Sequence, residues 1–93
     1  MKSAYELAME RLQKQSPSAP LTAEQKAQIA EIDSLYRAKV AEKELFLAEQ
    51  IRREEQAGAS AEVDRLTQQL ASEIRRLQDD CEQKKGRVRA GQD

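Results

Sequence analysis

The sequence contains no histidine and no tryptophan, and it has only one cysteine, two prolines and three glycines. Without histidine, the chain lacks the most common general base of enzymes and the carboxylate–histidine ligand set of di-iron helical bundles. Its single cysteine, Cys81, allows no disulfide bond within the chain. We therefore expect a protein that is not an enzyme, with no catalytic residue, no metal site and no cofactor.

Long apolar runs and an excess of one charge are missing as well. No stretch of about 18 consecutive apolar residues is present to cross a bilayer, and charged residues interrupt the opening segment MKSAYELAMERL where a secretory signal is apolar. Lysine and arginine (16) nearly balance aspartate and glutamate (17), which gives no overall attraction to polyanions. We expect no membrane contact, do not expect nucleic acid as the main partner, and favour the cytoplasm, where a lone thiol stays reduced.

What the sequence does contain is typical of long helices. Charged residues make up 35% of the chain, and alanine, leucine and glutamine are frequent among the rest. Residues that favour strands never alternate with polar ones over a useful length, and glycine and proline are too sparse for the turns of a sheet. The sequence predicts an all-α fold: a long antiparallel helical hairpin of coiled-coil type, preceded by a short N-terminal helix and pairing into a dimeric helical bundle.

Residues 1–15 form the predicted N-terminal helix. Ser3 and Glu6 have the spacing of a capping box, in which each side chain bonds a free amide of the first helical turn. Tyr5, Met9 and Leu12 then recur at helical spacing on one face. Two prolines in the segment 16–21 remove amide donors and disfavour helix, so this segment is expected to be a linker.

The hairpin is expected to span residues 22–86, with helices at about 23–57 and 61–85 and a turn at 58–60. Thr22 and Gln25 form a second capping box, and Gly58 suits the positive φ that often ends a helix. Ser60 is a good N-cap for the second long helix. Gly86 weakens that helix, so residues 87–93 are expected to be a frayed polar tail.

Two apolar stripes define the expected core of the hairpin. On the first long helix the spacing of the apolar residues repeats about every eleven residues, which favours a nearly straight helix. A short turn makes the two long helices antiparallel neighbours, and folding near Gly58 brings the stripes together with Tyr36 near Cys81. The predicted core residues are Ile29, Ile32, Tyr36, Val40, Leu47 and Ile51, facing Val63, Leu70, Ile74, Leu77 and Cys81.

Leu66 lies beside Ile51 in the folded hairpin, but its flank extends the apolar surface beyond these stripes, as do Leu35, Leu45 and Phe46, and this surface needs a cover. Two arrangements are open: the N-terminal helix docks on its own hairpin, or a second copy of the chain pairs with it. A twelve-residue helix cannot cover a face about 50 Å long, and closed two-fold pairing is common among small helical chains. We therefore expect a homodimer. The predicted interface residues are Met9, Leu12, Leu35, Leu45, Phe46 and Leu66.

Several acidic residues precede a basic residue by four positions, as in Asp33 with Arg37 and Glu49 with Arg53. This order stabilises an exposed helix by a few tenths of a kcal/mol per pair. These pairs support helicity and carry no functional information.

The preferred function is a noncatalytic protein–protein interaction or structural module, acting as a helical hairpin that homodimerises. The sequence does not identify any further protein partner. The alternative is a small nucleic-acid-associated protein that uses the basic C-terminal residues Lys84, Lys85, Arg87 and Arg89. Such binding requires charge on one face together with aromatic groups for stacking. The three aromatic residues of this chain lie on apolar helix faces instead, so the interaction module remains the preferred hypothesis.

Overall fold

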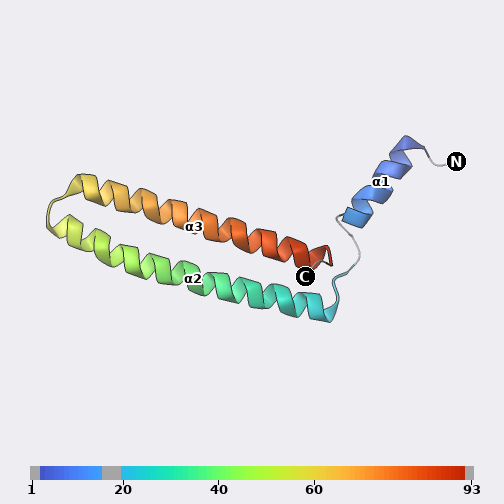
Figure 1. Cartoon of the computed structure of the whole chain (residues 1–93), viewed down its shortest axis with the longest axis horizontal. Coiled ribbons are helices and arrows are strands. Elements are labelled where there is room, and N and C mark those ends of the chain that lie inside the picture. The colour runs from blue at the N-terminus through green and yellow to red at the C-terminus, as the bar shows by residue number, and fades with distance from the viewer. Residues whose placement is uncertain (1–2, 16–19, 92–93) are drawn as a thin grey trace.

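The computed structural model describes residues 3–15 and 20–91 and contains three helices in them: α1 (Ala4–Gln15), α2 (Ala23–Gln56) and α3 (Ser60–Arg89). The long helices α2 and α3 lie side by side and antiparallel, while α1 stands away from their open end (Figure 1). Within the described residues α1 contacts neither long helix. The molecule is correspondingly elongated, with dimensions of 72 × 30 × 16 Å. The predicted all-α helical hairpin is confirmed.

The start of α2 is fixed by the predicted capping box. The Thr22 hydroxyl oxygen accepts a hydrogen bond from the Gln25 amide at 3.0 Å, and the Gln25 side-chain oxygen accepts one from the Thr22 amide at 2.9 Å. Both bonds satisfy amides that the first turn of a helix leaves free. From there α2 continues for 34 residues, a length of about 51 Å.

The turn between α2 and α3 depends on Gly58, which adopts a φ of +72°. Glycine reaches this conformation without the steric penalty of a Cβ atom. The Gly58 amide donates to the carbonyl of Glu55 at 3.1 Å. Ser60 is not the N-cap that the sequence suggested, because the Ala59 carbonyl already accepts from the Val63 amide at 3.0 Å. Ala59 is therefore the N-cap, and Ser60 is the first residue of α3.

Helix α3 extends further than the sequence indicated. It passes through Gly86 without interruption and ends at Arg89, just before Gly91 with a φ of +75°. Val88 is buried, and its carbonyl accepts a hydrogen bond from the Gln25 side-chain amide at 3.1 Å. These tertiary contacts offset the low helix propensity of Gly86. The frayed tail expected for residues 87–93 is thus absent from residues 87–91, and the last two residues lie outside the described part.

The core is a narrow stripe between α2 and α3. Tyr36, Leu47, Leu66, Cys81 and Val88 are buried. The other residues assigned to the hairpin core are half-buried, because two helices alone cannot enclose both flanks of their contact; they are Ile29, Ile32, Val40, Ile51, Val63, Leu70, Ile74 and Leu77.

Polar contacts across the hairpin define how the two helices are aligned. The Gln25 side chain bonds Val88, and the Lys43 ammonium lies 3.8 Å from the Glu73 carboxylate. Between these contacts Tyr36 and Cys81 face the same groove. The alignment therefore holds over much of the length of the hairpin.

Candidate functional site

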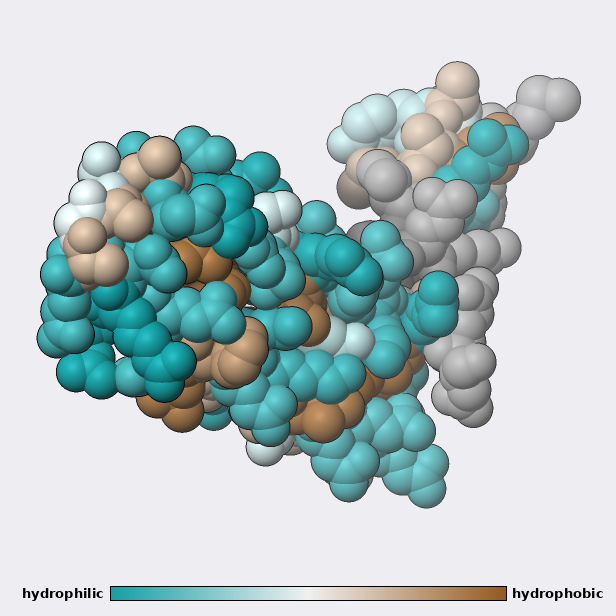
Figure 2. Space-filling view, turned by 60° about the vertical axis from the view of Figure 1, so that its left-hand side comes forward, coloured by the Kyte–Doolittle hydropathy of each residue, from teal (hydrophilic) through white to brown (hydrophobic). Residues whose placement is uncertain are grey.

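The most unusual surface of the hairpin is a set of exposed apolar side chains on α2. Leu35, Leu45 and Phe46 are 51%, 75% and 65% exposed, respectively. Leu35 and Phe46 are eleven residues apart, so they lie on the same side of the helix at a separation of about 16 Å. Figure 2 shows hydrophobic side chains reaching the surface of the hairpin between hydrophilic ones. Large exposed apolar groups that gather on one surface are typical of protein interfaces.

A second exposed apolar surface lies on α1. Tyr5, Leu7 and Met9 are 74%, 48% and 41% exposed. Among the interface residues expected on this helix, Met9 is therefore accessible, whereas the side chain of Leu12 lies outside the described part of the structure. Leu7 was missed from the sequence because it does not fall on the helical stripe that contains Tyr5 and Met9.

Leu66 does not belong to this exposed surface. Only 4% of it is accessible, and it lies in the core between α2 and α3. Its position on the flank of the α3 stripe suggested an outward orientation, but α2 covers it. A partner therefore has no access to Leu66 while the hairpin is intact, and of the expected interface residues on the hairpin only Leu35, Leu45 and Phe46 are exposed.

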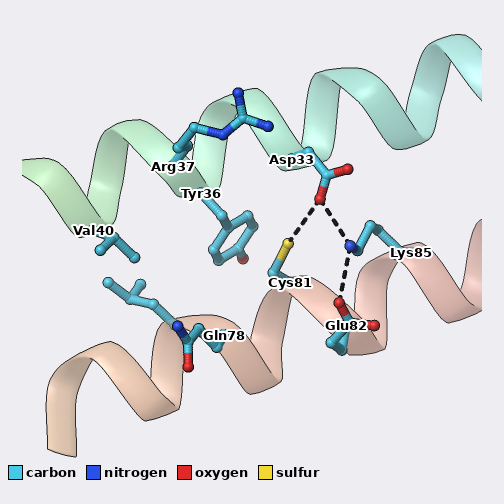
Figure 3. A pocket seen from close by; sticks show the side chains of 9 residues that line it. Asp33, Tyr36, Arg37, Val40, Gln78, Cys81, Glu82 and Lys85 are labelled. Atoms are coloured by element: carbon cyan, nitrogen blue, oxygen red, sulfur yellow. Dashed lines mark hydrogen bonds and ion pairs between the residues drawn. The ribbon is translucent and has the colours of Figure 1, made fainter. Parts of the chain in front are cut away.

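A shallow groove of about 290 Å³ lies between the two long helices. Its polar end contains a cluster of Asp33, Cys81, Glu82 and Lys85 (Figure 3). The Lys85 ammonium lies 2.8 Å from a carboxylate oxygen of Asp33 and 2.9 Å from one of Glu82. The Cys81 thiol donates to the same Asp33 oxygen at 3.7 Å. The groove thus joins α2 to α3 by polar contacts as well as by packing.

The electrostatics of the cluster keep each group in its usual protonation state at neutral pH. The hydrogen bond from Lys85 lowers the pKa of Asp33, and the bond to Asp33 raises the pKa of Lys85. Burial raises the pKa of the Cys81 thiol. General acid–base catalysis works best with a group that titrates near the working pH, and a reactive cysteine requires a lowered pKa. None of these three groups has the required shift.

The basic C-terminal residues are partly engaged within the hairpin. Lys84 lies over the ring of Tyr36 at 5.2 Å from its centroid, and Lys39 lies over the same ring at 4.8 Å. Lys85 is 13% exposed and paired with two carboxylates. Lys84 nevertheless remains exposed, as do Arg87 and Arg89 in the last turn of α3, where cations are favoured by the helix dipole. Of the four basic C-terminal residues, only Lys85 is withdrawn from solvent into ion pairs.

The described residues have few features of other kinds of site. In residues 3–15 and 20–91, no three histidine, cysteine, aspartate or glutamate side chains are grouped so that they could hold a metal ion. No helix of this part of the chain has the length and apolar character needed to cross a bilayer. Comparison of the sequence and the structure with protein-family models, curated proteins and solved structures gives no match.

Proposed function

We propose that this protein is a noncatalytic protein–protein interaction or structural module, and that it acts as a homodimer of rigid helical hairpins. The single observation that carries this proposal is the exposure of Leu35, Leu45 and Phe46 on one long helix. Exposing such residues is unfavourable, and a partner that covers them removes the penalty.

The gain available from covering this surface is sufficient for a dimer of moderate affinity. Burial of a fully exposed leucine or phenylalanine side chain contributes about 1.5–3 kcal/mol, and Leu35, Leu45 and Phe46 are still 51%, 75% and 65% exposed, so roughly half to three quarters of this gain is available from each. Two-fold symmetry doubles the contribution, because both copies bury the same three residues. Part of this gain is offset by the entropy lost on association. A dissociation constant in the micromolar range is therefore expected.

The hairpin is suited to a structural role because its long helices are held together along their length. Helix α1, with Tyr5, Leu7 and Met9 exposed, supplies a second apolar surface for a further protein partner. The proposal places the protein in the cytoplasm, where the single thiol of Cys81 stays reduced. It assigns no catalytic step to any residue.

Replacement of Phe46 by glutamate tests the proposal. A charge at this position opposes burial against a second copy, since an unpaired charge is costly to desolvate. We expect F46E to elute as a monomer in size-exclusion chromatography with light scattering, with its helical content unchanged. Wild-type protein should elute as a dimer under the same conditions.

Lys26→Glu is the control. Lys26 is also exposed on α2, but it lies about 160° around the helix from Phe46 and about 100° from Leu45. K26E is expected to remain dimeric. If F46E and K26E associate to the same extent, the exposed apolar side chains of α2 do not form the interface.

A further inference from the structure

Two of the exposed apolar residues of α2, Leu35 and Phe46, belong to a stripe with a specific order. Leu35, Lys39, Glu42 and Phe46 follow one another at intervals of four, three and four residues. At about 100° per residue these positions remain within an arc of about 60°. The stripe therefore has an apolar residue at each end, with a base and an acid between them.

This order is self-complementary under one symmetry operation. We infer that a second copy of the chain binds the stripe in the antiparallel direction, around a two-fold axis that crosses α2 midway between Leu35 and Phe46. Leu35 then lies opposite the partner's Phe46, and Lys39 lies opposite the partner's Glu42. Each contact occurs twice, as a closed two-fold interface requires. The inference rests on the proposed homodimer and assigns its geometry.

Charge excludes the parallel alternative. A two-fold axis along the helices places every residue beside its own copy, so that Lys39 meets the partner's Lys39 and Glu42 meets the partner's Glu42. Like charges across an interface are unfavourable. The antiparallel arrangement converts both of these contacts into attractive pairs.

The central charges of the stripe are also the ones that the hairpin leaves without an ion pair. Glu42 is exposed, and its carboxylate forms no ion pair within residues 3–15 and 20–91. The Lys39 ammonium contacts the Tyr36 ring, and among the side chains that the structure describes no acidic one pairs with it. By contrast, Glu49 at the next turn is already paired with Arg52 at 2.7 Å. Lys39 and Glu42 are therefore the groups available for pairing across the axis.

The same axis determines where α1 lies in the assembly. Antiparallel pairing about the middle of α2 brings Ala23 of one copy opposite the partner's Gly58. Each end of the resulting four-helix bundle then contains the start of α2 from one copy and the hairpin turn of the other. The two α1 helices emerge at opposite ends, about 50 Å apart. The dimer is thus a bivalent spacer that presents one α1 surface at each end.

Reversal of one charge at a time tests this geometry in trans. In the inferred dimer, Lys39→Glu places an acid opposite the partner's Glu42 at both contacts. Glu42→Lys likewise places a base opposite the partner's Lys39 at both contacts. Each variant alone should dimerise at least about tenfold more weakly than wild type, since two attractive pairs become repulsive. In an equimolar mixture, both pairs across the axis become attractive again. Sedimentation velocity with one variant fluorescently labelled should detect a heterodimer with an affinity close to that of the wild-type dimer.

Controls separate the geometry from folding and from net charge. Recovery in the mixture shows that both chains are folded, and circular dichroism of Lys39→Gln checks that loss of the Tyr36 contact leaves the hairpin intact. Lys26→Glu and Glu44→Lys make the same charge changes on exposed positions of α2 outside the stripe. Each of these two control variants should dimerise like wild type.

Three results are decisive. The inferred axis is supported if wild type is dimeric, K39E and E42K each dimerise weakly alone, and their mixture forms a heterodimer with an affinity close to that of wild type. A dimeric wild type with variants that dimerise normally, or with a mixture that does not recover, overturns the axis but leaves the proposed homodimer in place. A wild type that is monomeric at every accessible concentration overturns both.

Discussion

Replacing Leu47 by alanine should destabilise the hairpin far more than replacing Leu45, although the two leucines are only two residues apart on α2. Leu47 is 2% exposed and Leu45 is 75% exposed. Leucine-to-alanine changes in a core cost about 2–5 kcal/mol, depending on how far the site collapses. A core formed by two helices has little surrounding structure to hold a cavity open. We therefore expect L47A to lie in the lower part of this range, at about 2–3 kcal/mol.

Thermal unfolding followed by far-ultraviolet circular dichroism measures this difference. For a chain of this size, 1 kcal/mol corresponds to about 4–8 °C in Tm, so L47A should lower the Tm by about 10–20 °C. L45A should change it by no more than the equivalent of about 0.5 kcal/mol, as expected for an exposed position. The measurement is made at a concentration where F46E and wild type are both monomeric. Equal losses in the two variants would refute the alignment of α2 against α3.

Two further predictions concern the turn and the groove. Gly58→Ala should destabilise the hairpin by about 1–2 kcal/mol in urea titrations, because Gly58 has a φ of +72°. Gly86→Ala should instead stabilise it by about 0.5–1 kcal/mol, because a Cβ at this helical position meets no atom within 4 Å. Similar effects at both glycines would contradict the positive φ assigned to Gly58. The lowered pKa of Asp33 means that its pairing stabilises the fold above the unfolded-state pKa and is lost as the pH falls through the folded-state pKa. The Tm difference between wild type and Asp33→Asn should therefore be largest above about pH 5 and shrink below about pH 4. A Tm difference that grows on acidification would contradict the assigned contact with Lys85.

The features that local sequence determines were predictable. The Thr22–Gln25 capping box and the positive φ of Gly58 both depend on residues within four positions of each other. The i,i+4 contact of Glu49 with Arg53 is present at 3.5 Å for the same reason. Helical periodicity also indicated two facing stripes, because the spacing of apolar residues shows which side of each helix is buried.

The features that depend on tertiary contact were not predictable in this way. Asp33 was expected to pair with Arg37 on its own helix, but it pairs with Lys85 across the hairpin at 2.8 Å. The end of α3 was placed too early, since the contact between Gln25 and Val88 is visible only when the alignment of the two helices is known. The flank of Leu66 was expected to reach an interface because helical angle alone does not show how far α2 covers the flank of α3. The exposed state of Leu35, Leu45 and Phe46, which defines the candidate site, was predictable because these residues exceed what one stripe can bury.

Sedimentation equilibrium of the unmodified protein over a wide concentration range tests the central claim most directly. The apparent mass should rise from that of the 10.5 kDa chain at low concentration to twice this value and then level off, since a closed two-fold interface allows no further growth. A mass that stays at 10.5 kDa throughout, or one that continues to increase beyond the dimer, would contradict the pairing of hairpins through α2.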